Sequence, residues 1–342
     1  MERERTEPVD LCDARGRLNP EARGWSRRPD LRANLRGAWG RKKRWDYWCV
    51  LTDEIVVACV AADIDYAGLA NVWILDRARE HHAMAAVLRP LARGISLPEQ
   101  ACTGTVVVED RALRLRIEER ADHTRLVASA PRSAGGIAGA IDVDVVVAKP
   151  PAHESLNVVV PWSDRRFQFT SKHNTRPATG TVRVGDRRWT VDASHDAWGV
   201  QDLGRGIWKY ANRWNWASAS GRADDGRTVG LQFGGKWTVG TGATENGLCI
   251  DGTLSKLGEE LEWTYDWSRP LRPWRVRTVG SDRVDVTLTP TFDRYENTDL
   301  GLLKMEVHQC FGTWSGRVVG DDGRPLELRG LLGFAEEARN RW

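Results

Sequence analysis

The chain of 342 residues lacks long apolar runs, which restricts where it can work. No segment approaches the roughly 20 apolar residues that a membrane-spanning helix needs. The first ten residues, MERERTEPVD, alternate charges and do not supply the apolar core of a secretion signal. We therefore expect a cytoplasmic protein without a membrane span. Its oligomeric state is not predictable from these features.

Paired cysteines are also lacking. The six cysteines are scattered, without a CxxC motif or a tight Cys/His cluster, at Cys12, Cys49, Cys59, Cys102, Cys249 and Cys310. Scattered thiols are typical of a reducing compartment, and metal sites need ligands at closer spacing. We expect no metal site and no cofactor.

The net charge of +3 gives no strong excess of either sign. The exception is the run Arg41, Lys42, Lys43 and Arg44 near Trp45. Basic residues beside aromatic rings can bind nucleic acid. Nothing later in the chain extends this patch, so we favour a solvated basic turn and keep a nucleic-acid partner as the weaker alternative.

Several catalytic signatures are missing. The sequence has no GxSxG elbow, no HExxH motif, and no glycine fingerprint between a strand and a helix. A phosphate-binding loop is approached at Gly230 to Lys236, but Trp237 replaces the hydroxyl residue that would hold magnesium. These absences disfavour hydrolase, kinase, zinc-protease and dinucleotide-dependent activities.

Strand patterns recur along the whole chain at short spacing, which predicts an all-β fold. Residues 47–60 form an apolar run broken at Thr52-Asp53, and Leu113, Leu115 and Ile117 alternate with charged residues. Tight hairpins are expected at Gly185-Asp186 and at Asp251-Gly252. Many strands without βαβ alternation favour barrels or sandwiches.

Two segments are helical by propensity. Residues 77–93 are ambiguous because Pro90 interrupts them, and we make no assignment there. Residues 331–341 are predicted to form a short C-terminal helix that covers a barrel end. The polar segment around Pro177 suggests three parts: an extension over residues 1–40, a first barrel over residues 41–176, and a second over residues 177–342.

Tryptophan is abundant, at 17 residues. The richest constellation contains Asp202, Arg205 and Trp208, and Trp214 and Trp216 follow it. Tryptophans alternating on a strand form a flat wall that suits an unsaturated ligand. A structural explanation is equally plausible: the acid and the arginine form a buried pair while the rings fill the core.

Two further groups carry candidate acids. Glu245 and Asn246 lie in a Gly/Thr/Asn loop, and Glu306 and His308 share one face of a predicted strand. A buried carboxylic acid with a raised pKa, or a histidine near neutrality, could protonate an alkene or a carbonyl group. A lone histidine on a strand is more often a core residue with its hydrogen bonds satisfied.

Eight short motifs resemble the bacterial family called domain of unknown function 2804 over nearly the whole chain. They are Gly24 to Pro29, Arg41 to Trp45, His153 to Asn157, Pro161 to Ser163, Asp202 to Gly206, Trp214 to Ala219, Thr244 to Gly247 and Glu306 to Gln309. That family is similar to the lipocalin-like, or calycin, group of carotenoid hydratases, tocopherol cyclases and survival-factor proteins. The resemblance implies two tandem antiparallel barrels, but it assigns no reaction. The chain departs from these relatives in having Trp198 to Gln201 ahead of Asp202.

Two functions follow as hypotheses. The first is binding of an apolar or unsaturated small molecule in a Trp-lined barrel, with Arg205, Trp208, Trp214, Trp216, Asn246 and Glu306 as ligand-binding residues. The alternative is a cofactor-free hydratase, cyclase or isomerase that acts on such a ligand. Its candidate acids are Asp202, Glu245 and His308, and nearby indoles would stabilise positive charge.

Overall fold

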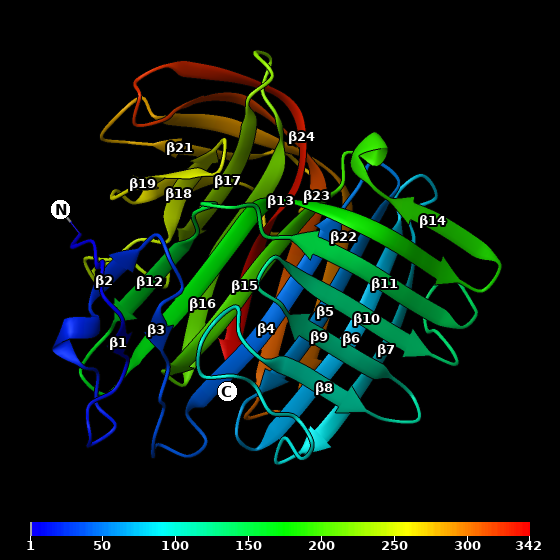
Figure 1. Cartoon of the computed structure of the whole chain (residues 1–342), viewed down its shortest axis with the longest axis horizontal. Coiled ribbons are helices and arrows are strands. Elements are labelled where there is room, and N and C mark those ends of the chain that lie inside the picture. Colours follow the sequence, from blue (N-terminus) through cyan, green and yellow to red (C-terminus); the bar gives the residue numbers. More distant parts are fainter. Residues whose placement is uncertain (1) are drawn as a thin grey trace.

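The computed structural model describes residues 2–342 and is built almost entirely of β-strands (Figure 1). Within these residues, helix is confined to two single turns, η1 (Pro20–Ala22) and η2 (Ala193–His195). Two antiparallel sheets of 13 and 9 strands make up the body, and β1 (Val9–Asp10) and β3 (Leu31–Arg32) form a small parallel pair. The predicted all-β fold is confirmed.

The first sheet runs in the order β7-β6-β5-β4-β15-β13-β11-β10-β9-β8. In addition, β12 and β14 pair with β13, and β2 pairs with β12. Its strands are β2 (Gly24–Ser26), β4 (Lys42–Leu51), β5 (Ile55–Asp63), β6 (Ala67–Asp76), β7 (His81–Pro90), β8 (Thr105–Glu109), β9 (Arg114–Glu119), β10 (His123–Ala130), β11 (Ile141–Ala148), β12 (Leu156–Pro161), β13 (Phe167–Val184), β14 (Arg187–Val191) and β15 (Trp198–Ile207).

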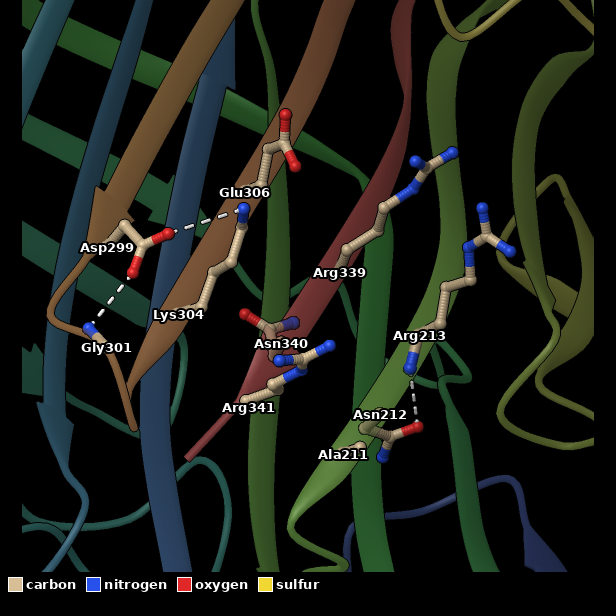
Figure 2. Close-up of a pocket in the computed structure, with 10 residues that line it drawn as sticks. All are labelled: Ala211, Asn212, Arg213, Asp299, Gly301, Lys304, Glu306, Arg339, Asn340 and Arg341. Carbon is tan, nitrogen blue, oxygen red and sulfur yellow. Dashed lines mark hydrogen bonds and ion pairs between the residues drawn. The ribbon is translucent and has the colours of Figure 1, made fainter.

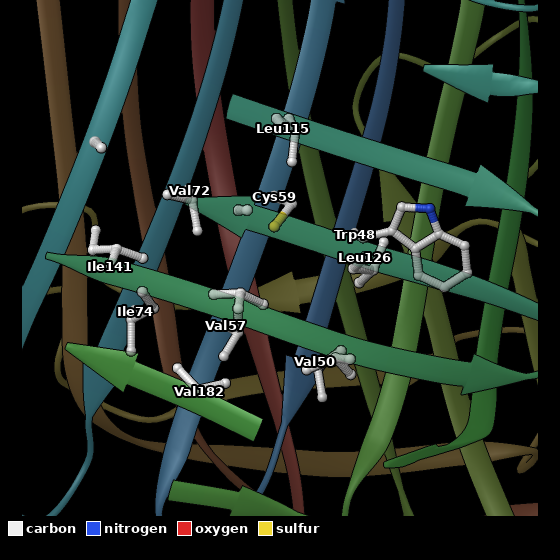
Figure 3. Close-up of a cluster of buried hydrophobic side chains, with 14 of the residues drawn as sticks. Trp48, Val50, Val57, Cys59, Val72, Ile74, Leu115, Leu126, Ile141 and Val182 are labelled. Carbon is white, nitrogen blue, oxygen red and sulfur yellow. The ribbon is translucent and has the colours of Figure 1, made fainter. Parts of the chain in front are cut away.

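This sheet curls over itself. Figure 3 shows β9, β10 and β11 crossing the strands β4 to β6, and apolar side chains fill the space between the two layers. The sequence of β11 shows why apolar side chains gather there. Its buried residues alternate with more exposed ones, so one face of the strand contributes to the core and the other faces water. The first half of the chain is thus a curled half-barrel with its own core.

The second sheet runs in the order β19-β18-β17-β16-β24-β23-β22-β21-β20. Its strands are β16 (Ala211–Arg222), β17 (Thr228–Gly235), β18 (Asn246–Ile250), β19 (Thr253–Leu257), β20 (Leu261–Thr264), β21 (Trp274–Thr278), β22 (Val284–Asp299), β23 (Lys304–Val319) and β24 (Pro325–Arg341). It also curls, which brings Trp263 of the edge strand β20 against Gly235 of β17.

The two half-barrels pack against each other along their central strands. Phe311 and Phe334 of the second sheet share an apolar cluster with Cys49 and Trp73 of the first. β15 is buried at every position because both of its faces are covered. The division between the sheets follows Ile207, whereas the sequence placed a domain boundary after residue 176, which lies inside β13.

The predicted C-terminal helix is wrong. Residues 331–341 belong to β24, which pairs with β16 on one side and with β23 on the other. The segment contains Ala335, Glu336, Glu337, Ala338 and Arg339, all of which favour helix by propensity. A strand with both faces covered does not need alternating apolar and polar residues. The sequence of β24 therefore carries no strand pattern that could be recognised.

The other local predictions have clear outcomes. The ambiguous residues 77–93 contain strand β7. The hairpin at Asp251-Gly252 joins β18 to β19, and both residues have the positive φ values, 48° and 82°, that a tight hairpin turn requires. Gly185-Asp186 joins β13 to β14 as expected.

Candidate functional site

The most unusual polar cluster lies where the two sheets meet. In the first sheet, Lys172 of β13 is directly opposite Asp202 of β15. In the second sheet, Trp216 of β16 is directly opposite Glu336 of β24. The Lys172 ammonium lies 4.3 Å from the centre of the Trp216 ring, so the two cross-strand pairs face each other. We call this group, together with Glu245, the inter-sheet centre.

Lys172 is the cation of this centre. Its Nζ lies 2.8 Å from Asp202 Oδ1 and 3.5 Å from Glu245 Oε2. All three residues are buried. Burial lowers the pKa of Lys172, but the charges of Asp202 and Glu245 outweigh it and hold the pKa above its usual value. One ammonium therefore stays charged between two carboxyl groups.

Glu245 is only 1% exposed. Burial raises its pKa to about 7, although Lys172 acts in the opposite direction. Its Oε1 accepts a hydrogen bond of 2.7 Å from Trp237 Nε1, while its Oε2 has no hydrogen-bond partner among the described residues. Near neutral pH this carboxyl group can therefore hold or release a proton.

Glu336 is the second acid with this property. Burial raises its pKa to about 7, and a hydrogen bond from the Trp214 indole acts in the opposite direction. Trp214 Nε1 lies 2.9 Å from Oε1, and Gln309 Nε2 lies 3.0 Å from Oε2. Gln309 also contacts the Tyr47 hydroxyl of the first sheet at 3.3 Å. A hydrogen-bonded chain thus runs from one sheet to the other through this acid.

Indole rings surround the centre. Trp45 Nε1 donates a hydrogen bond of 3.0 Å to Asp202 Oδ2. Beside it, Trp208 stacks on Trp237 with ring centres 5.7 Å apart. The same apolar cluster also contains Trp25, Trp162, Trp214 and Trp342. Indole faces attract cations, so this wall suits a ligand that develops positive charge.

Two glycines make room for the charged groups. A Cβ atom on Gly204 would lie 2.1 Å from the Trp45 ring, and one on Gly234 would lie 2.1 Å from the Glu245 side chain. Neither distance is compatible with a side chain. Gly204 therefore lets Trp45 reach Asp202, and Gly234 lets Glu245 approach the first sheet.

Five of the residues predicted from the sequence come together here. They are Asp202, Glu245, Trp208, Trp214 and Trp216.

Arg205 and Asn246 have other surroundings. Arg205 is buried and pairs with Asp46 at 2.6 Å, apart from the inter-sheet centre. Asn246 accepts a hydrogen bond from the Gly234 backbone and donates one to the Glu259 carbonyl. Both interactions are of the kind that fixes a turn or a strand end.

His308 lies elsewhere. Its neighbour in the chain, Gln309, contacts Glu336, so His308 faces the opposite side of β23. His308 Nδ1 lies 2.7 Å from Asp293 Oδ2, and its ring stacks on Tyr295. Glu306 accepts a hydrogen bond of 3.2 Å from the Tyr295 hydroxyl. These two predicted residues share a face of the second sheet, away from Lys172.

A surface pocket of about 370 Å³ lies near that face (Figure 2). It is lined by Ala211, Asn212, Arg213, Asp299, Gly301, Lys304, Glu306, Arg339, Asn340 and Arg341. Basic and acidic side chains mix along its rim, and none of the residues of the inter-sheet centre lines it.

The basic run predicted near the N-terminus does not form a free patch. Lys43 is fully buried, Lys42 pairs with Asp65 at 3.1 Å, and Arg44 pairs with Asp63 at 2.8 Å. Most of its charge is therefore engaged within the protein.

Sequence reasoning missed Lys172 and Glu336, although both are central. Lys172 stood in a segment interpreted as a linker between domains. Glu336 stood in the segment interpreted as a helix. Each of these residues lies inside a strand and has buried residues on both sides. A charged residue within a run of buried positions was the signal that could have identified them as site residues.

No group of three or more metal-ligating side chains occurs within residues 2–342. In the same part of the chain, no helix is long and apolar enough to cross a membrane.

Comparison with known proteins agrees with this architecture. Kievitone hydratase from Nectria haematococca is similar in structure, with 12% identity, a TM-score of 0.51, and alignment over 89% of this chain and 89% of that chain. A putative AttH from Nitrosomonas europaea aligns over 87% of this chain and 92% of that chain, with 12% identity and a TM-score of 0.48. At this level of identity the likeness to kievitone hydratase concerns the fold alone.

Sequence comparison is more specific. No curated protein is similar enough in sequence to count as a match. Residues 2–342, however, match the family described as a domain of unknown function (DUF2804). Since that match covers the described chain from end to end, as the short motifs indicated, the protein belongs to the DUF2804 family.

Proposed function

We propose that the inter-sheet centre catalyses proton transfer to an unsaturated, largely apolar small molecule without a cofactor, as a hydratase, cyclase or isomerase does. One observation carries this proposal: Glu245 and Glu336 are buried acids with pKa values of about 7, held in one network with a charged lysine. An acid with a pKa near the working pH is suited to general acid catalysis.

The chemistry can be written for hydration. The protonated Glu245 gives its proton to one carbon of an alkene, and the π electrons form the new C–H bond. The other carbon becomes a cation, which the indole face of Trp214 stabilises, because Lys172 already lies over the ring of Trp216. Water adds to that carbon and loses a proton to the Glu245 carboxylate. Alkene and water give an alcohol, and the acid is regenerated.

Cyclisation and isomerisation share the first step. In a cyclase, a second double bond of the substrate attacks the cation, and loss of a proton ends the reaction. In an isomerase, loss of a proton from the neighbouring carbon moves the double bond. Asp202 stays paired with Lys172 in each case and supplies negative charge beside the cation.

The structural neighbour kievitone hydratase is named for the addition of water. Its likeness in fold is compatible with the proposal, which rests on the acids of this chain.

Incubation in deuterium oxide tests the catalytic proposal. Purified protein is mixed with a panel of prenylated phenols, linear isoprenoid alkenes and α,β-unsaturated ketones, and products are analysed by mass spectrometry. We expect enzyme-dependent deuterium incorporation at carbon, and loss of most of it in Glu245→Gln. His308→Gln serves as the matched control because it lies outside the centre. No incorporation from any member of the panel would contradict the proposal.

Ligand binding without chemistry is the second candidate. The indole wall around Trp208 and Trp237 favours it, because such a wall binds flat apolar molecules whether or not they react. Native mass spectrometry with the same panel tests it. Binding that persists in Glu245→Gln, with no deuterium incorporation in the wild type, would assign the protein as a carrier.

A further inference from the structure

A second polar cluster lies behind the inter-sheet centre. His173 follows Lys172 in β13 and Gln201 precedes Asp202 in β15, so both face the opposite side of the first sheet. There they meet Cys102, whose Sγ lies 3.6 Å from His173 Nε2 and 3.8 Å from Gln201 Oε1. Cys102 is partly exposed, while the other five cysteines are buried.

Arg176 brings a buried positive charge to this cluster. It is 5% exposed, and its Nε and Nη1 meet no hydrogen-bond acceptor within the described residues. The carboxylate of Glu119, whose charge acts on Cys102, is already paired with Lys149 at 2.5 Å. A buried guanidinium without an anion is costly, because both its charge and its N–H groups lose their hydration. The arrangement therefore favours a negative charge beside Arg176.

The hydrogen bonds of His173 also make its ring a donor toward Cys102. Arg176 Nη2 donates to His173 Nδ1, so the proton of the neutral ring is on Nε2. Burial, and then the charge of Arg176, lower the pKa of His173 well below its usual value, so the ring stays neutral. The Ser171 hydroxyl donates to Asn157 Oδ1, which leaves its oxygen, and the Cys102 sulfur, as acceptors for His173 Nε2–H.

Cys102 is the group that can become an anion at this place. Burial raises the pKa of its thiol, and the charge of Arg176 acts in the opposite direction. The reduced protein thus keeps a neutral thiol and an unpaired cation. Oxidised sulfur is more acidic than a thiol, and a sulfinic acid is ionised at neutral pH, so oxidation would place the missing charge beside Arg176.

We propose that Cys102 is a site of oxidation by hydroperoxides, and that its oxidised, anionic sulfur is held by Arg176 and His173. In the first step the thiol loses its proton to solvent and the resulting thiolate attacks the distal oxygen of the hydroperoxide. The O–O bond breaks and the leaving oxygen takes the proton of the attacked hydroxyl group, so a sulfenate and water or an alcohol form. Sulfur loses two electrons and the peroxide gains them. A second hydroperoxide converts the sulfenate to the sulfinate in the same way.

Peptide mapping by mass spectrometry tests this inference on the full chain. The protein is treated with hydrogen peroxide, the sulfenate is trapped with dimedone, and the sulfinate is detected by its two added oxygen atoms. We expect Cys102 to react at least about tenfold faster than any other cysteine, because it is the partly exposed one and the charge of Arg176 opposes the rise of its thiol pKa. Equal rates at Cys102 and the buried cysteines would overturn the inference.

Two variants separate anion stabilisation from simple access. Arg176→Met is expected to slow oxidation of Cys102, while Arg77→Met, which removes a guanidinium bonded to the Thr52 and Asp53 carbonyls, is expected to leave it unchanged. Oxidation should also raise the thermal midpoint of the wild type and lower that of Arg176→Met. If Arg176→Met does not fold, the wild-type midpoint decides: a fall on oxidation of Cys102 rejects the pairing.

Discussion

Lys172 and Asp202 are direct neighbours across β13 and β15, and the ammonium of one lies 2.8 Å from the carboxylate of the other. Between the two sheets this pair meets two further acids, Glu245 and Glu336, which share its electrostatic environment. Four charged or chargeable side chains from both sheets thus form one buried centre. Such a centre is costly to bury and is typically retained for function.

Replacement of Lys172 by methionine should be strongly destabilising. The change leaves Asp202 and Glu245 buried without their cation, and loss of one partner of a buried pair costs about 3–5 kcal/mol. The free energy of unfolding in urea measures the loss. The double variant Lys172→Met with Asp202→Asn should recover part of it, because the uncompensated charge is removed. Additive losses in the double variant would show that the two side chains do not interact.

Stability should depend on pH through Glu245 and Glu336. Burial raises the pKa of both groups from 4.5 to about 7, so the folded chain binds these protons more tightly than the unfolded chain does. Their stabilising effect is complete below pH 4.5 and is lost as the pH rises through about 7.

The measurement is urea unfolding between pH 5 and 8. Each group can change the free energy of unfolding by up to about 1.4 kcal/mol per pH unit. Glu245→Gln and Glu336→Gln should each remove one acid's share, so the difference in free energy of unfolding between wild type and variant should fall as the pH rises from 5 to about 7. Glu337 does not interfere: although burial raises its pKa, hydrogen bonds from Lys236 and Tyr265 lower it to about 2. His173, whose pKa burial lowers, acts in the opposite direction, but it does so equally in the wild type and in both variants. Variant profiles that run parallel to that of the wild type would therefore contradict the assignment.

Gly204→Ala should disrupt the inter-sheet centre. The added methyl group would meet the Trp45 ring at 2.1 Å and push the indole away from Asp202. Overpacking of this kind costs about 1–3 kcal/mol. Thermal unfolding and tryptophan fluorescence measure the effect. Gly258→Ala is the matched control, because its exposed site has no neighbour closer than 3.9 Å. Equal midpoints for the two variants would contradict close packing at Gly204.

His308 should not take part in the chemistry of the inter-sheet centre. Its imidazole pairs with Asp293 on the other face of β23. His308→Gln is expected to keep the ligand affinity and the deuterium incorporation of the wild type, while Glu336→Gln reduces incorporation. Titration calorimetry with a ligand found in the panel supplies the affinity. A large loss of incorporation in His308→Gln alone would move the reaction to the second sheet.

The strand content of this protein follows from its sequence, because the alternation in β11 and the turn residues Asp251-Gly252 act over a few neighbouring positions. Asp202 and Glu245 could be named as candidate acids for the same local reason: Asp202 stands among glycines and tryptophans, and Glu245 stands in a loop of glycine, threonine and asparagine. The family resemblance was also contained in short motifs.

The packing of the two curled sheets decided which side chains meet in the inter-sheet centre. Glu336 lies in a segment with helical propensity, yet pairing on both sides makes it a strand. This pairing places the acid in the inter-sheet centre, where the charge of Lys172 acts on its pKa. His308 and Gln309 are adjacent in the chain but face opposite sides of β23. Propensity acts between near neighbours, whereas desolvation and charge pairing depend on groups up to hundreds of residues apart, so only the tertiary structure fixes which acids share a site.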